Sequence, residues 1–410
     1  MEGTFTTRNL APNDIKQVVD EVNKISHKAF GEEKDLIGRV YEYFLKEFAV
    51  NATKEEGEFY TPHDVVQLIA TMVEPFDGTL YDPCCGSGGM FVQSTDLIRE
   101  KRGDIRRINV YGQEKEAATY RLAKMNLVLN NVRGTITHAN SYYRDPYDSF
   151  GNFDYVMANP PFNVDGVELD QVKDQPRFNT YGVPQNKTKN KKKDAKETVP
   201  NGNYLWINQF ATALNDTGRA ALVMANSASD AGNSEKDIRV KLIESGIISQ
   251  MVTLPSNMFT SVTLPATLWF FDKAKVKKDE ILFIDARNME TEPYEDSRTQ
   301  RQLTAKTIDE ITSAYHSFRN HEKKATKSDG TEIEYADKQG FWKIATLEEI
   351  REKDYNLTPA SYVGVVPIEE DKEPFDEKMK RLIKKLYNVI DESQKLDEEI
   401  KHQLNEMGWN

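Results

Sequence analysis

The sequence predicts a doubly wound α/β fold with a mostly parallel, seven-stranded sheet, a short helical segment before it and a long helix after it. Short apolar runs alternate with helix-sized amphipathic stretches between residues 79 and 271, which is typical of a parallel sheet covered on both faces. Glycine-rich or polar residues follow several of these runs, as they do at the ligand-binding edge of such sheets. Near the C-terminus, apolar residues recur at coiled-coil spacing.

Residues 1–57 form the predicted N-terminal helical segment, because the stretch 35–45 places its apolar side chains three and four positions apart. Residues 58–275 form the domain that contains the sheet. Its predicted strands are Thr79–Tyr81, Ile108–Tyr111, Thr135–Thr137, Phe153–Ala158, Arg219–Met224, Ile247–Leu254 and Thr267–Phe271. Two amphipathic stretches between them, Ala117–Leu129 and Asp237–Ser245, are predicted helices.

Three segments depart from this alternation. Residues 162–203 form a polar loop with six lysines between Lys187 and Lys196, which either contact the phosphates of a polyanionic partner or belong to a solvated insert. Residues 276–365 form a mixed extension in which only Ile281–Ile284 is a predicted strand. Residues 366–410 form an amphipathic, coiled-coil-like helix that either docks onto a partner or packs along its own domain. Its seven-residue steps are Met379, Leu386, Ser393, Ile400 and Met407.

Composition narrows the class of protein. An apolar fraction of 38% over 410 residues indicates a globular chain. With a net charge of −12, any DNA binding requires a local basic surface or a basic partner. The two cysteines, Cys84 and Cys85, are adjacent and too few for a closed zinc site. We therefore predict no metal and a reducing compartment. No leader or membrane-spanning run is evident, so we expect a cytoplasmic protein without membrane contact.

A glycine-rich turn, "LYDPCCGSGGMF", follows the first predicted strand. Gly86, Gly88 and Gly89 allow a tight turn that aims the amides of a helix N-terminus at a ligand. Asp82 leaves a carboxylate beside that ligand. Taken alone, the same pattern also occurs in tight turns that bind nothing.

The second predicted strand, "INVYGQE", ends at Glu114. A carboxylate at this position holds a ribose diol in many nucleotide-binding folds. Together with the glycine-rich turn it predicts a cofactor that contains adenosine, either a dinucleotide or S-adenosylmethionine. Without the turn, Glu114 would be interpreted as a solvated strand end.

The stretch "FDYVMANPPF" favours S-adenosylmethionine. Its prolines fix the backbone at the carboxyl end of the fourth predicted strand. The side-chain carbonyl of Asn159 and the backbone carbonyl of Pro160 can then both accept hydrogen bonds from an exocyclic amino group. Such bonds localise the nitrogen lone pair for attack on a methyl sulfonium, and Phe162 offers a face for a flipped base. Alone, such a motif is most often a proline-stiffened turn.

Several motifs together resemble those of the S-adenosylmethionine-dependent adenine-N6 DNA methyltransferases, and more closely the modification subunits of type I restriction–modification systems. In chain order they are "DLIGRVYEYFLKEFA", "GEFYTPHDVV", "DPCCGSGGMF", "GQE", "NPPF" and "GRAALVMANSASD". The resemblance covers about residues 35–275. It implies the Rossmann-like methyltransferase sheet and methylation of adenine N6 in DNA. The N-terminal segment is shorter than is usual in that family.

The resemblance also implies roles for residues at matching positions. The methionine end of the cofactor would be held by Glu58, Phe59, Tyr60, Thr61, Pro62 and His63, although His63 could equally be a helix-start residue. Ser87, Gly88 and Gly89 match the glycine loop, Glu114 matches the ribose-binding acid, and Asn140 lies where the third strand would approach the adenine of the cofactor. The residues that match the catalytic motif are Asn159, Pro160, Pro161 and Phe162.

The partners implied by the resemblance are double-stranded DNA, a specificity subunit that reads the sequence and a second copy of the modification subunit. Whether a restriction subunit also joins is open. Two alternatives remain at this stage. The same Asn-Pro-Pro-aromatic motif serves methyltransferases that act on glutamine amides of proteins, usually with Tyr in place of Phe162, and a non-catalytic DNA-binding subunit could retain the pocket.

Overall fold

The computed structural model describes residues 61–365 and 375–406, except residues 102, 187–195, 260–264, 295–298, 321–323, 327–329 and 335–336. The predicted N-terminal segment and most of the lysine run therefore lie outside the described residues. The chain divides into two compact units, one ending at Gly364 and one beginning at Val365, and each is described by itself. None of the helices described here combines the length and apolar character that crossing a bilayer requires.

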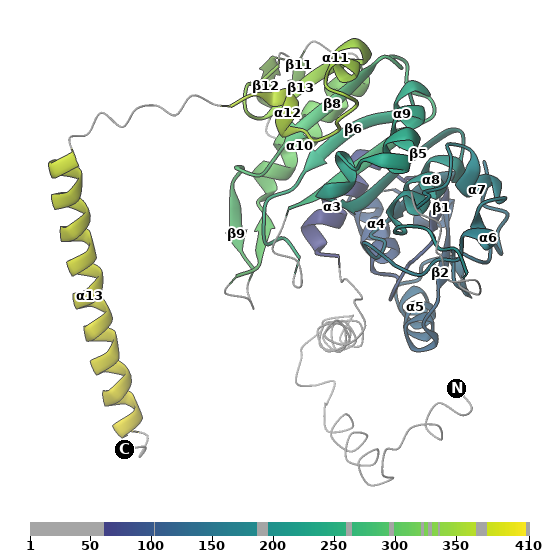
Figure 1. Cartoon of the computed structure of the whole chain (residues 1–410). Helices are drawn as coiled ribbons and strands as arrows, with labels where there is room; N and C mark the ends of the chain where they lie inside the picture. The colour runs from purple at the N-terminus through teal and green to yellow at the C-terminus, as the bar shows by residue number, and fades with distance from the viewer. Residues whose placement is uncertain are drawn as a thin grey trace, which may run out of the picture. The chain divides into compact units, whose positions relative to one another are not determined.

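A nine-stranded sheet forms the centre of the first unit, in the order β13-β8-β6-β7-β5-β4-β1-β2-β3 (Figure 1). The seven predicted runs are all strands of this sheet. They are β1 (Gly78–Asp82), β2 (Ile108–Glu114), β3 (Gly134–His138), β4 (Phe153–Ala158), β5 (Leu214–Ala225), β6 (Ile248–Thr253) and β7 (Ala266–Asp272). β7 lies antiparallel between β5 and β6, whereas β3, β2, β1, β4 and β5 are parallel.

Two further strands enlarge the predicted seven-stranded sheet, and both come from the stretch interpreted as a mixed extension. β8 (Glu280–Asp285) pairs with β6 and contains the predicted run Ile281–Ile284. β13 (Trp342–Thr346) pairs antiparallel with β8 and was not predicted. Because β13 lies at the sheet edge and is only partly buried, its sequence lacks a clear apolar alternation.

Alternate residues of the central strands enter two different cores, one on each face of the sheet. Leu80 and Met157 belong to the first core, while their neighbours Tyr81 and Val156 belong to the second. This period of two follows from strand geometry. Both faces are buried, which explains why the strands read as continuous apolar runs.

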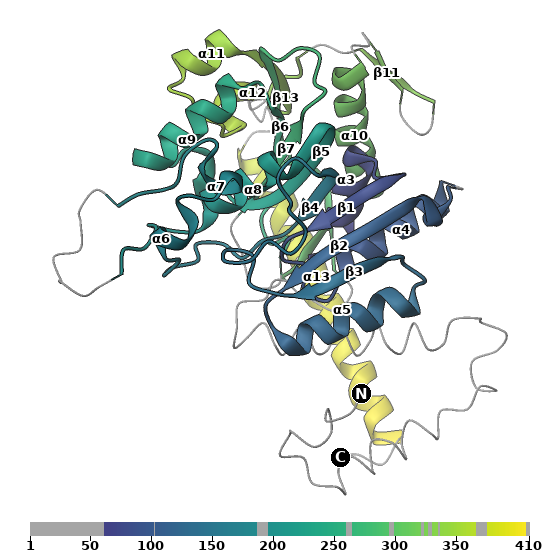
Figure 2. The ribbon, with the colours of Figure 1, turned by 90° about the vertical axis from the view of Figure 1, so that its right-hand side faces the viewer.

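Helices cover both faces of the sheet (Figures 1 and 2). The first core receives side chains from α3 (His63–Val73), α4 (Gly89–Glu100), α5 (Ala117–Leu129) and α10 (Ala305–Asn320). The second receives them from α8 (Asn203–Ala213), α9 (Asn233–Glu244), α11 (Leu347–Glu352) and α12 (Ala360–Val363). This arrangement on both faces is the predicted doubly wound architecture.

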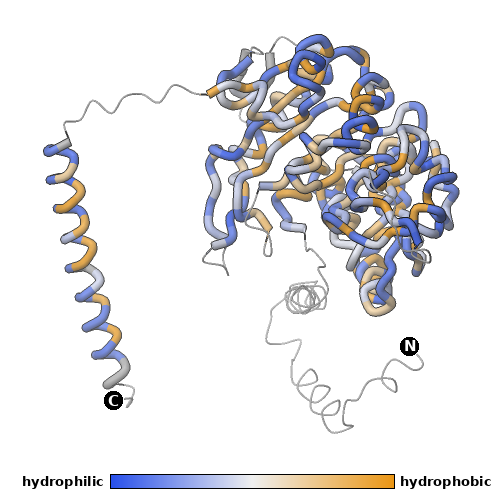
Figure 3. The backbone as a smooth tube through the Cα atoms, in the orientation of Figure 1, coloured by the Kyte–Doolittle hydropathy of each residue, from blue (hydrophilic) through white to orange (hydrophobic). Residues whose placement is uncertain are grey.

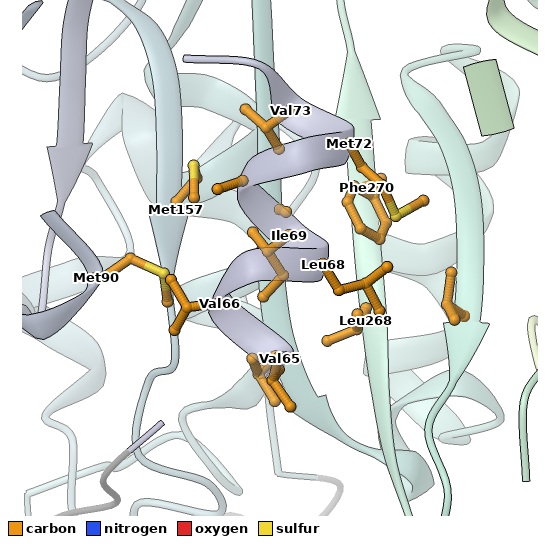
Figure 4. Close-up of a cluster of buried hydrophobic side chains, with 14 of the residues drawn as sticks. Val65, Val66, Leu68, Ile69, Met72, Val73, Met90, Met157, Leu268 and Phe270 are labelled. Atoms are coloured by element: carbon orange, nitrogen blue, oxygen red, sulfur yellow. The ribbon is translucent and has the colours of Figure 1, made fainter. Parts of the chain in front are cut away.

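Helix α3 packs flat on the first face of the sheet and fixes where its own N-terminus lies. Figure 4 shows Val66 beside Met90 of α4, and Leu68 and Met72 facing Leu268 and Phe270 of β7. The guanidinium of Arg219, in the amino half of β5, donates to the carbonyl oxygen of Val73 at 2.9 Å. Because this contact holds the C-terminal end of α3, the helix start lies toward the carboxyl edge of the sheet.

The remaining elements are short. The loop after β4 contains α6 (Leu169–Val172) and α7 (Pro176–Asn179), and 3-10 turns occupy Ile105–Arg107 and Asn226–Ser229. Two hairpins complete the described part of this unit. They consist of β9 (Thr291–Pro293) with β10 (Arg301–Leu303), and of β11 (Lys324–Thr326) with β12 (Glu332–Glu334).

The second unit contains one long helix, α13 (Phe375–Glu406). Apolar residues recur along it among charged ones, as the hydropathy colouring shows (Figure 3). The described part of this apolar stripe consists of Met379, Leu382, Ile383, Leu386, Val389, Ile390, Leu396 and Ile400. The predicted helix is therefore present, while its last predicted heptad position, Met407, lies outside the described residues.

Candidate active site

Four predicted site residues follow the carboxyl ends of four neighbouring parallel strands. Asp82 ends β1, Glu114 ends β2, Asn140 lies two residues after β3, and Asn159 directly follows β4. The strands lie side by side in the order β4-β1-β2-β3 and run parallel. Their carboxyl ends therefore meet at one edge of the sheet, which is where open α/β sheets bind ligands.

Hydrogen bonds tie the glycine-rich turn to the tip of β2. The backbone N–H of Gly86 donates to Oε2 of Glu114 at 3.0 Å, and that of Cys85 donates to the carbonyl of Gln113 at 2.9 Å. From α5, Asn126 donates to the carbonyl of Ser87 at 3.0 Å. Glu114 thus holds the turn in place, a role that its position in the sequence did not reveal.

The glycines of the turn serve two different purposes. Gly86 and Gly88 have φ of +54° and +80°, a backbone conformation that favours glycine. A Cβ added at Gly88 would lie 3.2 Å from Leu127, whereas one added at Gly86 or Gly89 would meet no atom within 4 Å. The open space beside Gly86 and Gly89 forms a cradle, and this fits a ligand approaching the backbone of the turn.

Two buried carboxyl groups flank this turn. The pKa of Asp82 is raised to about 8, chiefly by burial and to a smaller extent by the nearby charge of Glu114, while a hydrogen bond from the Cys84 amide at 2.9 Å acts in the opposite direction. Burial also raises the pKa of Glu114, although the amides of Glu116 and Gly86 partly oppose this. Acids held in such unfavourable surroundings are typical of functional sites, because packing alone gives no reason to keep them.

We expect Asp82→Asn to stabilise the protein in a pH-dependent way. Between an ordinary pKa of 3.8 and the folded-state value of about 8, the folded protein binds more protons than the unfolded one. The wild-type protein therefore loses stability as the pH rises through this interval. The variant should melt at least about 2 °C above wild type at pH 8, and the difference should shrink toward pH 4. Thermal unfolding at several pH values measures this.

Asp154 at the start of β4 provides the opposite control. Its burial raises its pKa, but hydrogen bonds from Thr79 and Asn215 outweigh the burial and hold the pKa below 3.8. Asp154→Asn should therefore melt below wild type at pH 7. A pH-independent difference between Asp82→Asn and wild type would contradict the proposed cause.

The side-chain amide of Asn159 lies at this edge of the sheet, directly after β4. Its Oδ1 and Nδ2 are both buried and make no hydrogen bond among the described residues. Buried amide groups are normally satisfied, because leaving one unpaired costs about 1–3 kcal/mol. Phe162, partly buried, packs against both cores. Among the described residues, the motif therefore presents a side-chain amide with no hydrogen-bond partner, three positions before an aromatic residue that packs on both cores.

A buried hydrogen-bond network lies under the strand tips and was not predicted. Tyr81 donates to the side-chain oxygen of Gln113, and Gln209 of α8 donates to the Tyr81 hydroxyl at 3.1 Å. Gln113 in turn donates to the carbonyl of Arg144 at 3.1 Å. Tyr81 and Gln113 directly precede Asp82 and Glu114, so the network holds the backbone from which both acids project. Nothing in the sequence relates Gln209 to these strands.

Arg177 of α7 was also missed. Its guanidinium is almost fully buried and donates to the carbonyl oxygens of Ser141 at 2.6 Å and Tyr142 at 3.3 Å. The segment that follows the predicted catalytic motif is thereby attached to the segment that follows Asn140. The sequence predicts a polar loop for this stretch, and nothing in the pattern around Arg177 indicates that its side chain is buried.

The segment before the sheet is described only in part. Pro62 is buried and caps α3, Thr61 is half-buried and His63 is the exposed first residue of the helix. Glu58, Phe59 and Tyr60 lie outside the described residues. In the described ranges, no three His, Cys, Asp or Glu side chains are grouped so that they could hold a metal ion.

Comparison with known proteins identifies the family. The model of the N-6 DNA methylase family matches residues 32–371. The chain belongs to this family. The prediction made from the sequence motifs is thereby confirmed at the level of the family.

Methylase subunits of type I restriction enzymes are similar along nearly the whole chain. The MjaIX subunit of Methanocaldococcus jannaschii is 37% identical over 95% of this chain and 66% of its own length. The HindI subunit of Haemophilus influenzae is 36% identical over 92% of this chain and 79% of its own length. The chain thus spans about two thirds to four fifths of these two relatives and is homologous to type I methylase subunits.

A solved structure supports the fold. The type I restriction-modification system methyltransferase subunit from Streptococcus thermophilus superposes with a TM-score of 0.68 at 28% identity, covering 86% of this chain and 68% of that one. The predicted α/β methyltransferase fold is therefore confirmed, with two strands more than the seven expected.

Proposed function

We propose that the chain is the catalytic modification subunit of a type I restriction–modification complex and that it methylates N6 of adenine in double-stranded DNA. The observation that carries this proposal is the buried amide of Asn159 at the carboxyl end of β4, which has no hydrogen-bond partner in the described part of the chain. It lies on the sheet edge where Asp82 and Glu114 end neighbouring strands. Membership of the N-6 DNA methylase family supports it.

The proposed cofactor is S-adenosylmethionine, which supplies a methyl group on a cationic sulfonium. Glu114 would accept hydrogen bonds from its ribose hydroxyls, and Asn140 would lie toward its adenine. The amides of the turn Gly86–Gly89 would approach it where a Cβ would find open space. Asp82 would place a carboxylate near the cationic end, and residues 58–63 would hold the methionine part.

The proposed chemistry depends on hydrogen bonding to the adenine amino group. Oδ1 of Asn159 and the carbonyl oxygen of Pro160 accept its two hydrogens, which draws the nitrogen toward tetrahedral geometry and localises its lone pair. S-adenosylmethionine would supply the methyl group: N6 would gain the methyl carbon, the sulfur would keep the electron pair of the broken carbon–sulfur bond and leave as a neutral thioether, and the surplus N6 proton would pass to solvent. Phe162 provides the stacking face that holds a base flipped out of the duplex. The chain contributes position and charge complementarity, and no side chain forms a covalent intermediate.

The direct test is transfer of a deuterated methyl group to DNA. The chain, assembled with the specificity subunit of its own system, is incubated with labelled S-adenosylmethionine and unmethylated genomic DNA. Mass spectrometry of the digested nucleosides should find the label in N6-methyladenine. Label in glutamine side chains of protein would instead indicate the protein methyltransferase, and no transfer by the assembled complex would indicate the non-catalytic subunit.

The proposal includes partners, since base reading is assigned to a specificity subunit rather than to this chain. Two modification subunits would join one specificity subunit on DNA, and participation of a restriction subunit is a further part of the proposal. Because the substrate is the DNA of the cell, the enzyme would act in the cytoplasm. The lysine run, which lies outside the described residues except for Lys196, would either contact phosphates or remain solvated.

We expect removal of residues 374–410 to abolish assembly with the specificity subunit and to leave cofactor binding intact. The first unit ends at Gly364 and contains every described site residue, whereas α13 offers an apolar stripe of the kind that docks onto another helix. Co-purification measures assembly, and calorimetry measures cofactor binding. Normal assembly of the truncated chain would contradict this role of α13.

Point substitutions in α13 test whether its apolar stripe makes the contact, which removal of the whole helix cannot show. Leu386→Ser with Ile390→Ser removes two stripe residues one turn apart and should weaken assembly. Lys384→Ser with Asp391→Ser changes neighbouring polar positions of the same helix and should not. Equal effects of the two pairs would argue against docking through the apolar stripe.

A further inference from the structure

Two asparagines hold the backbone directly after the proposed catalytic motif in a reciprocal pair. The backbone N–H of Asn163 donates to Oδ1 of Asn203 at 2.8 Å. Nδ2 of Asn203 donates to Oδ1 of Asn163 at 2.9 Å. The two residues lie forty positions apart in the sequence, so this pair closes the base of the entire loop that follows the motif.

The motif has few backbone donors with which to fix itself. Pro160 and Pro161 have no N–H, and the residue after Phe162 is Asn163, whose φ is +53°. Asparagine tolerates this left-handed conformation better than most residues. The chain therefore reverses immediately after Phe162, and the side chain of Asn203 meets the first backbone N–H beyond that aromatic ring.

Asn203 attaches the backbone at Asn163 to a buried helix. It is the first residue of α8, is only 3% exposed, and every residue of that helix is buried. Its own N–H donates to Oδ1 of Asn201 at 3.0 Å, and Gly202 donates to the carbonyl of Val164 at 2.9 Å. Together with the two bonds between Asn163 and Asn203, the Gly202–Val164 bond makes three hydrogen bonds that join the start of α8 to the residues directly after the motif.

Gly202 shows that this junction is packed closely. A Cβ at Gly202 would lie 2.3 Å from the hydroxyl of Tyr142, which belongs to the segment after Asn140, and 3.4 Å from Val164. The segments that follow β3 and β4 therefore meet at the start of α8. Because Asn203 is hydrogen-bonded to the residue after Phe162, a shift of Asn203 would also move the backbone of Phe162.

We propose that Asn203 and Asn163 form a clamp that positions Asn159 to Phe162 for methyl transfer. This inference rests on the proposed function, and it assigns Asn203 and Asn163 as positioning residues. β4 holds the motif from its N-terminal side and the clamp holds it from its C-terminal side. Losing the clamp should lower turnover without affecting cofactor binding, since Asp82 and Glu114 lie on other strands.

Hydrogen exchange of the full-length chain tests the clamp without any activity. Because the prolines have no exchangeable amide, a peptide covering 159–164 reports on Phe162, Asn163 and Val164. Asn203→Ala should increase its exchange rate by about tenfold, with no change in peptides that cover β1 or β2. Asn215→Ala is the matched control, because it removes another part-buried amide that donates to a side chain, that of Asp154 at 2.8 Å. Unchanged exchange in Asn203→Ala would overturn the clamp.

Turnover of the assembled complex tests positioning. Asn203→Ala and Asn163→Gly, which retains the left-handed backbone, should each lower kcat by about 10- to 100-fold, with the affinity for S-adenosylmethionine within about twofold of wild type and Asn215→Ala unchanged. The double variant should lose no more than Asn203→Ala alone, because Asn203→Ala already removes both hydrogen bonds of the pair, whereas Asn163→Gly keeps the backbone N–H that donates to Asn203. Asn203→Asp, which keeps the acceptor for the Asn163 amide, should recover part of the loss.

The outcomes distinguish the two proposals. Additive losses, or equal losses in kcat and in cofactor affinity, would overturn the positioning role. If the wild-type complex transfers no methyl group, the proposed function fails, and the exchange measurement still decides whether the clamp holds the motif.

Discussion

Asn159→Ala should lower methyl transfer to DNA by about 10²–10³-fold, the loss expected when one preorganised hydrogen-bonding group is removed from a reacting centre. Oδ1 of Asn159 is the proposed acceptor for the adenine amino group. Without it, only the carbonyl of Pro160 would remain to localise the nitrogen lone pair. Single-turnover transfer from labelled S-adenosylmethionine to unmethylated DNA measures the effect.

The fold should tolerate this substitution. Both polar atoms of the Asn159 side chain lack partners among the described residues, so alanine removes a buried polar group without leaving another unsatisfied. We therefore expect an unfolding temperature equal to or above that of wild type, with normal assembly and cofactor binding. A loss of transfer smaller than about tenfold would contradict the assignment of Asn159 as the principal acceptor.

Glu114→Ala should weaken binding of S-adenosylmethionine to the isolated chain by about 10²-fold or more. A hydrogen bond to a charged group contributes about 1.5–3 kcal/mol, and the carboxylate would make two to the ribose. Glu114 also accepts from the amide of Gly86 at 3.0 Å, so its removal loosens the glycine-rich turn. Isothermal titration calorimetry measures the change.

Two variants separate these contributions. Glu114→Gln keeps an oxygen that can accept from Gly86 and should lose less affinity than Glu114→Ala. Glu116→Ala removes a neighbouring acid whose side chain pairs only loosely with Lys115, at 3.6 Å, and should bind normally. Wild-type affinity in Glu114→Ala would place the cofactor elsewhere, whereas no binding by well-folded wild type would mean that a partner completes the site.

The sheet was predictable because its strands are buried on both faces. Leu80 and Tyr81 enter opposite cores, so the run around them is apolar throughout and easily recognised. β13 escaped prediction for the opposite reason, since it is a partly buried edge strand. Residues at strand ends, such as Glu114 and Asn159, could be expected to lie together because parallel topology places all such ends at one edge.

From the sequence it was possible to recognise the seven central strands, the edge of the sheet at which the predicted site residues lie and the family to which the chain belongs. These features are local: each depends on residues within a few positions of one another, and local patterns leave a readable signal. The structure alone decided which distant residues support the site, namely Gln209 beneath the strand tips, Arg177 across the two loops and Asn203 against Asn163. Such contacts depend on how the chain folds back over tens of residues, and no spacing in the sequence encodes that distance.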